Sequence, residues 1–276
     1  TGRGLNENLA RELLELHTLG VGGRYDQRDV RELAELLTGL TYTARTGFRF
    51  RAQNAEPGAE TVLGVSYGGG DPSLDDILRA LDDIARHPDT ARHIARKLAV
   101  HFIGPEPDTD LIDMMAARYL ESDGRLLPVY EAMLRHDAAW APEYRKVKPP
   151  LDFIASAMRA LGVDPAMIRG ASLQDVRRVI YRPMQVMGQT WQAPVGPDGW
   201  PEEDEAWVTP QGMAGRITWA MTAPQALLDD LPDPRDFVRV ALGPTPPDAV
   251  LFAAQAAESR SDGIGVILAS AAFQRR

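Results

Sequence analysis

The 276-residue sequence contains no cysteine. Disulfide bonds, thiolate-bound zinc, iron–sulfur clusters and thiol nucleophiles are therefore excluded. The sequence also lacks any apolar run that approaches the ~18 residues of a membrane-spanning helix, so we expect no membrane span. The 30 lysine and arginine residues are outnumbered by 39 aspartate and glutamate residues. The formal net charge of −9 argues against a nucleic-acid partner, because phosphate contacts need clustered lysine and arginine.

Motifs of common enzyme chemistry are absent as well. The glycine triplet at 68–70 is not followed by the lysine and serine or threonine of a phosphate-binding loop, and its spacing is not that of a dinucleotide fold. No Gly-x-Ser-x-Gly elbow supports a serine hydrolase. We therefore expect no cofactor, and the motifs indicate no reaction.

Helical patterning dominates what is present. Apolar residues recur at helical spacing over most of the chain, and many segments begin or end with a capping residue, glycine or proline. The predicted helices cover residues 6–19, 26–38, 73–86, 89–103, 109–121, 125–136, 149–161, 173–187, 210–229, 235–242, 247–258 and 262–272. The sequence thus predicts a mainly α fold, a multi-helix single domain over residues 1–276.

Two segments depart from this pattern. Phe48 and Phe50 alternate with arginines, and residues 61–67 are rich in β-branched and aromatic side chains, so we expect a small β-hairpin excursion near residues 41–67. Residues 188–210 are rich in proline, glycine and tryptophan and are expected to form a long ordered loop pinned by its tryptophans. This loop is the predicted surface for a protein partner, and a carbohydrate-stacking groove is the alternative.

The first predicted helix carries a group of candidate site residues. Glu7, Arg11 and Glu15 are spaced i, i+4, i+8, which gives a charge ladder worth only a few tenths of a kcal/mol per pair. Asn8, Arg11 and Glu12 also lie beside several leucines. A buried structural network and a ligand-binding or catalytic site therefore both stay open.

Histidines supply the remaining candidates. His17 is expected to point into the core or into a pocket at the end of its helix. Glu12 and Glu15 precede His17 at a spacing that matches neither zinc-protease nor di-iron motifs, so we expect no bound metal; His17 and His93 are the fallback ligands.

A basic stretch follows the third predicted helix and comprises Arg86, His87, Arg92, His93, Arg96, Lys97 and His101. It is interpreted either as a solvated face that balances nearby aspartates or as an anion site. Helices 6–19 and 89–103 are predicted to pack together and to bring Arg11 and Glu12 near His93 or Lys97. The full set of candidate catalytic residues is Asn8, Arg11, Glu12, Glu15, His17, His93 and Lys97.

Several segments resemble a bacterial family called domain of unknown function 1800. The resemblance is carried by residues 6–20, 29–34, 37–39, 61–64, 91–98 with Phe102, 146–149, 199–201, 268–270 and 273–276. It covers the whole chain but corresponds to the C-terminal half of a typical member. It therefore implies that the missing N-terminal half of the same protein is a partner.

The family is named for having no assigned activity, so the resemblance implies no reaction. It implies a bacterial protein, and because many members carry export signals, an exported or periplasmic location is expected, with a cytoplasmic one still open. In the family, the loop before residues 61–64 commonly contains His-Asp-x-Gly-x-Lys, whereas this chain has Ala55-Glu56-Pro57-Gly58-Ala59-Glu60. No functional residue is carried over from that loop.

Two hypotheses about function follow. The first is a non-catalytic helical scaffold or interaction module. The alternative is an enzyme, such as a hydrolase acting on an envelope or extracellular substrate, with a polar site shared with the missing N-terminal half. A concave pocket at the candidate residues favours the enzyme, and the same groups sealed in the core favour the scaffold.

Overall fold

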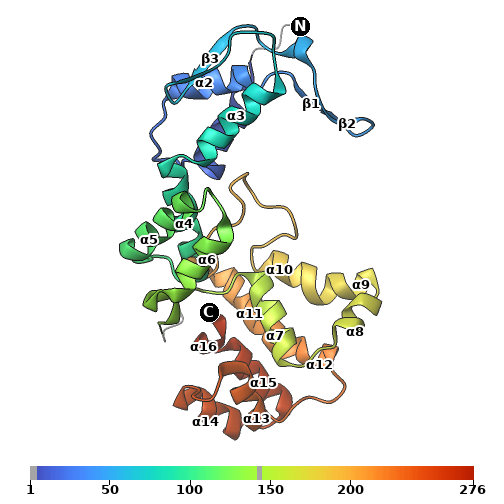
Figure 1. The fold of residues 1–276 in the computed structure, drawn as a ribbon. Coiled ribbons are helices and arrows are strands. Elements are labelled where there is room, and N and C mark those ends of the chain that lie inside the picture. Colours follow the sequence, from blue (N-terminus) through green and yellow to red (C-terminus); the bar gives the residue numbers. More distant parts are fainter. Residues whose placement is uncertain (1–4, 142–144) are drawn as a thin grey trace. The chain divides into compact units, whose positions relative to one another are not determined.

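The computed structural model describes residues 5–141 and 145–276, and the chain divides into two compact units, Thr1–Ala141 and Pro142–Arg276. In the described ranges the fold is mainly α with two small antiparallel strand pairs, as the sequence predicts (Figure 1). None of the described helices is long and apolar enough to cross a membrane. The single-domain organisation stays a prediction.

The N-terminal unit begins with α1 (Asn8–Glu12), which continues into a π-helical turn, η1 (Leu13–His17). The chain then reverses at Gly20, whose φ of +86° favours glycine. The next helix, α2 (Gln27–Leu36), begins with the predicted cap: Asp26 accepts the backbone N–H groups of Arg28 and Asp29, and the Asp29 side chain accepts from Asp26.

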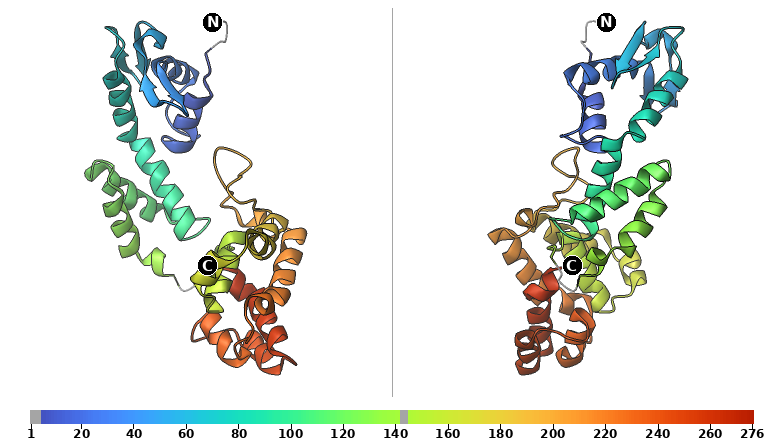
Figure 2. Two further views of the ribbon diagram at one scale, coloured as in Figure 1. Left: turned by 90° about the vertical axis from the view of Figure 1, so that its right-hand side faces the viewer. Right: turned by 60° about the vertical axis from the view of Figure 1, so that its left-hand side comes forward.

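The predicted β excursion consists of two hairpins, β1 (Leu40–Thr43) with β2 (Gly47–Phe50), and β3 (Ala59–Val62) with β4 (Val65–Gly68). A short 3-10 turn, η2 (Ala52–Asn54), precedes the second hairpin. Two carboxylates of α2 hold the second hairpin: Glu32 accepts from the Thr61 N–H at 2.8 Å and Asp29 from the Leu63 N–H at 2.7 Å. This hairpin lies beside α2 and α3 (Leu74–Ala85) (Figure 2).

The rest of this unit contains α4 (Pro88–Phe102), α5 (Thr109–Glu121), α6 (Leu126–Arg135) and the short turn η3 (Asp137–Trp140). The buried face of α4 carries Ala91, Ala95 and Ala99, whose small side chains allow α5 to approach closely. The unit therefore has two apolar clusters, one under the hairpins and one between α4, α5 and α6.

The C-terminal unit is helical throughout its regular structure and is built around α15 (Figure 1). Its helices are α7 (Pro150–Ala160), α8 (Pro165–Gly170), α9 (Leu173–Val176), η4 (Arg177–Tyr181), α10 (Arg182–Val186), η5 (Asp204–Ala206), α11 (Pro210–Thr222), α12 (Pro224–Leu227), α13 (Pro234–Leu242), α14 (Asp248–Ala256), α15 (Arg260–Ala269) and α16 (Ala271–Gln274). A Cβ at Gly265 would lie 2.2 Å from the Met221 sulfur, so glycine is what lets α15 pack against α11.

Some boundaries differ from the predicted ones for identifiable reasons. The segment 210–229 is two helices because Pro224 begins a new one, and α8 was not predicted. In the loop 188–210, Trp207 is buried and donates to the Pro201 carbonyl at 3.1 Å, whereas the Trp191 side chain is 43% exposed. Trp207 therefore pins the loop as predicted, and Trp191 packs on Tyr181 of η4, with 5.4 Å between the ring centroids.

Candidate functional site

The charged residues predicted on the first helix form a surface network. Arg11 lies 3.7 Å from a carboxylate oxygen of Glu7 and 3.5 Å from one of Glu15, and it donates a hydrogen bond to Gln27 at 2.7 Å. The Gln27 amide in turn donates to Glu7 at 2.7 Å. The Arg11 and Glu15 side chains are 38% and 29% exposed. The network is thus solvated and not sealed in the core.

The structure does not bring this network to α4. Asn8 and Lys97 are exposed, Glu12 is half-buried, and none of the hydrogen bonds and ion pairs of Arg11 reaches His93 or Lys97. The predicted pairing of Arg11 with α4 is therefore wrong, because α2 supplies Gln27 as its partner. The predicted position of Glu12 near His93 or Lys97 stays a prediction.

The two family-like helices do meet, at the end of the first one. His93 donates from Nε2 to the carbonyl oxygen of Leu16 at 3.2 Å, and a Cβ at Gly20 would lie 2.6 Å from its Nδ1. Burial lowers the pKa of His93, and the nearby charges of Lys97 and His17 lower it further against the Leu16 hydrogen bond. His17 itself is exposed, so its predicted core position is wrong.

His93 therefore forms a packing junction between α4 and the end of the first helix. Among the described residues, no group of three histidine, aspartate or glutamate side chains could hold a metal ion. The basic stretch that contains His93 makes surface ion pairs: Arg86 with Asp123 at 2.5 Å, and Arg92 with Asp113. His87 accepts the Asp89 N–H and caps α4. These pairings favour the solvated-face interpretation over an anion site.

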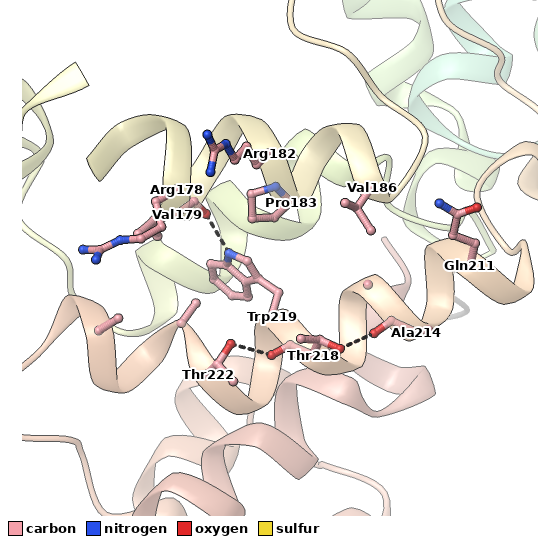
Figure 3. A pocket seen from close by; sticks show the side chains of 13 residues that line it. Arg178, Val179, Arg182, Pro183, Val186, Gln211, Ala214, Thr218, Trp219 and Thr222 are labelled. Atoms are coloured by element: carbon pink, nitrogen blue, oxygen red, sulfur yellow. Dashed lines mark hydrogen bonds between the residues drawn. The ribbon is translucent and has the colours of Figure 1, made fainter. Parts of the chain in front are cut away.

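A groove that the sequence did not predict lies in the C-terminal unit, between η4 and α10 on one side and α11 and α12 on the other (Figure 3). Its volume is about 690 Å³. The lining is mainly aliphatic and aromatic, with two arginines: Arg178, Val179, Arg182, Pro183, Val186, Gln211, Ala214, Gly215, Thr218, Trp219, Thr222, Ala223 and Ala226.

Small side chains on α11 open the groove. Ala214, Thr218 and Thr222 recur every four residues and share one helix face. A Cβ at Gly215 would lie 3.1 Å from Val186 Cγ1, so glycine lets α10 approach α11 at this end. The groove is therefore widest along the row of small side chains on α11, between the larger lining residues Gln211 and Trp219.

A proline and a tryptophan fix the wall opposite this face. Pro183 has no N–H to donate to the carbonyl of Val179, four residues earlier, and the preceding segment forms the π-helical turn η4. The indole N–H of Trp219, on α11, donates to that Val179 carbonyl at 2.8 Å (Figure 3). One hydrogen bond thus satisfies the carbonyl and joins the two walls of the groove.

The groove carries positive charge at its edge. Arg178 pairs with Asp175 at 2.9 Å, whereas no carboxylate in the described ranges pairs with Arg182, which is exposed. Residues 165–188 contain four arginines and one aspartate in a chain of net charge −9. No acidic residue is among the lining residues, so the local field favours an anion.

Acid–base chemistry has little support in this groove. The hydroxyl groups of Thr218 and Thr222 donate to the carbonyls of Ala214 and Thr218 at 2.8 and 2.7 Å, and the lining contains no histidine or carboxylate (Figure 3). The arrangement can bind an apolar group and an anion, but it offers no nucleophile with an adjacent base.

Beneath α11 lies a buried polar network. Arg216 is completely buried and donates to Gln274 Oε1 and to the Lys148 carbonyl, both at 2.8 Å. The Lys148 ammonium lies 3.8 Å from the centre of the Phe273 ring, and burial lowers its pKa to about 8. The neighbouring Lys146 is also buried and pairs with Glu202.

The sequence predicted a buried polar network but placed it on the wrong helices. The observed network joins residues 146–149 to residues 273–276, which are two of the segments that carried the family resemblance. The two lysines of residues 146–149 and the polar residues at 274–276, both in family-like segments, were the signal that could have found it.

Comparison with known proteins gives a family and no activity. The model of a family described as a protein of unknown function (DUF1800) matches residues 1–275, and the chain therefore belongs to that family. No curated protein matches the chain. No solved structure matches it either.

Proposed function

We propose that this member of the family is a non-catalytic helical binding module and that the groove between α10 and α11 takes a linear amphiphile, an apolar chain with an anionic head group. The observation that carries the proposal is an apolar groove flanked by Arg182, with no carboxylate in its lining.

The dimensions of the groove support this ligand class. Its volume of about 690 Å³ lies within the range of small-molecule pockets, roughly 300–1,000 Å³. Each methylene group buried along Val179, Val186 and Trp219 would contribute about 0.8 kcal/mol. Arg182 and Arg178 would hold a carboxylate or phosphate through charge-assisted hydrogen bonds.

The enzyme alternative has less support. Its candidate residues belong to the N-terminal unit, where they are exposed or half-buried, and none of them lines the groove. A protein partner at residues 188–210 and an N-terminal partner half stay proposals. Neither is needed for the groove to bind its ligand.

Calorimetric titration with dodecanoate, below its micelle concentration, tests the proposal. Thr218→Trp places a large ring in the groove and is expected to weaken binding at least tenfold. Ile217→Trp is the matched control, because Ile217 is 48% exposed on the same helix and does not line the groove. Equal binding by the wild type and Thr218→Trp, or no binding by the wild type, would contradict the proposed function.

A further inference from the structure

Three lysines occur in the chain, and each has a different environment. Lys97 is exposed on α4, so its ammonium keeps its water. Lys146 is buried and pairs with Glu202. Lys148 is half-buried, and no carboxylate among the described residues forms an ion pair with its ammonium. Of the three, Lys148 is therefore the lysine that has lost water without gaining an acidic partner.

The backbone fixes the position of Lys148. Its N–H donates to the Gln274 carbonyl at 2.8 Å, and its own carbonyl accepts from Arg216 at 2.8 Å. The ammonium lies 3.8 Å from the centre of the Phe273 ring. Because both backbone groups are held, the amine occupies a defined place against the ring, partly open to water.

Positive charge exceeds negative charge around this amine. Asp152, on α7, is the acid that acts on it, and that carboxylate pairs with Arg276. Burial lowers the pKa of Lys148 to about 8; the charge of Asp152 opposes this shift, and the charges of Arg276 and of Arg216, on α11, add to it. A sizeable fraction of the amine is therefore neutral near pH 7.5 and has its lone pair available.

The network around Lys148 also has a surplus of hydrogen-bond donors. Arg216 Nε is buried and has no hydrogen-bond partner in the part of the chain that the structure describes. A charged Lys148 adds three N–H donors, and the contact that the structure shows for them is the Phe273 ring. Conversion of the ammonium to an amide would remove the charge, leave one donor and add a carbonyl acceptor. The surroundings therefore favour an acylated Lys148.

We propose that Lys148 is an acylation site whose amine reacts with acyl phosphates. The nitrogen attacks the acyl carbon, the phosphate leaves with the electron pair of the carbon–oxygen bond, and the proton that the nitrogen loses goes to the departing phosphate. An acyl phosphate suits this place because its leaving group is an anion and because the charges of Arg216 and Arg276 act on Lys148. The reaction uses no residue of the groove, so it is independent of the proposed function.

Acetyl phosphate tests the site on the whole chain at pH 7.5, with acetylation of each lysine measured by mass spectrometry. We expect Lys148 to react at least roughly fivefold faster than Lys97, and the buried Lys146 to be slowest. The rate at Lys148 should level off above pH 8, because its pKa is about 8. In urea the three rates should become similar. A Lys148 that reacts no faster than Lys97, or a preference that persists in urea, would overturn the site.

Two neighbouring arginines give a matched pair of variants. Arg276→Ala removes a cation and frees Asp152 to pair with Lys148, so both changes favour the ammonium and the acetylation rate should fall severalfold. Arg275→Ala is the control and should keep the rate, because Arg275 lies 3.7 Å from Asp204 and its charge does not act on Lys148. Equal rates at Lys148 in Arg276→Ala and in the wild type would contradict the assignment.

Discussion

The two units differ in which charged side chains they bury. In the N-terminal unit several arginines form surface ion pairs with nearby carboxylates, and the buried side chains include an acid, Glu60. The C-terminal unit buries cations, Arg216 and Lys146, and leaves an apolar groove beside Arg182. The chain thus has a buried acid in one unit, and buried cations and a groove flanked by arginine in the other.

This difference shows that net charge says little about local binding. A chain of charge −9 contains a region whose field favours an anion, because four arginines fall within residues 165–188. Ion pairs on the surface contribute little to stability, whereas buried polar groups must be satisfied. The comparison therefore predicts that single substitutions cost most in the C-terminal unit.

The largest effect is expected at Arg216. Replacement by alanine leaves the Gln274 amide oxygen and the Lys148 carbonyl without their donor. It also opens a cavity beside the Phe153 ring, whose centroid lies 5.3 Å from the Arg216 guanidinium carbon. The free energy of unfolding should fall by roughly 3–5 kcal/mol. Urea denaturation followed by circular dichroism measures this, and a loss under ~1 kcal/mol would remove the energetic contrast between the units.

A smaller effect is expected at Trp219, where a second substitution tests the cause. Trp219→Phe removes the donor to the Val179 carbonyl and should cost roughly 1–3 kcal/mol. Pro183→Ala returns an N–H that can bond this carbonyl, so the same tryptophan change should cost less in that background. A double-mutant cycle of denaturation gives the coupling, and additive losses would show that the carbonyl does not depend on the indole.

The stability of the N-terminal unit should depend on pH because of its buried acid, Glu60. The pKa of Glu60 is raised above its ordinary value of 4.5, so the folded state holds the proton more tightly than the unfolded state. Its contribution to stability is present below pH 4.5 and is lost as the pH rises through the raised pKa. Glu60→Gln should therefore gain stability relative to the wild type between pH 4 and pH 8. A constant difference between the two midpoints would show that Glu60 titrates normally.

The smallest effect is expected in the surface network of the first helix. Arg11→Ala and Glu15→Ala should each cost under ~0.5 kcal/mol, and the coupling between them should be of similar size. Raising the salt concentration should reduce the coupling. A coupling of several kcal/mol would mean that this network is buried in solution.

Local signals predicted much of the fold. Asp26 and Ser73 cap the helices that they were predicted to begin, and the alternation near Phe48 and Phe50 identifies the first hairpin. Such signals act within a few residues and reflect backbone hydrogen bonds and side-chain direction. These signals therefore predict local structure correctly without knowledge of the tertiary contacts.

The sites could not be predicted in this way because they depend on distant pairs. The groove requires Trp219 to meet Val179, 40 residues earlier, and the environment of Lys148 requires Arg216, 68 residues later. The helical period shows that His17 lies near leucines. However, the chain reversal at Gly20 determines which face of the first helix the rest of the unit covers, and His17 stays exposed. The position of Arg11 failed for the same reason, since α2 and not α4 supplies its partner.

Hydrogen exchange with and without dodecanoate, below its micelle concentration, tests the central claim most directly, because it locates a bound amphiphile along the whole chain. The account predicts slower exchange in residues 177–186 and 210–226, which line the groove, and unchanged exchange in residues 5–141. Protection in the N-terminal unit, or none in either unit at concentrations that saturate binding, would contradict it.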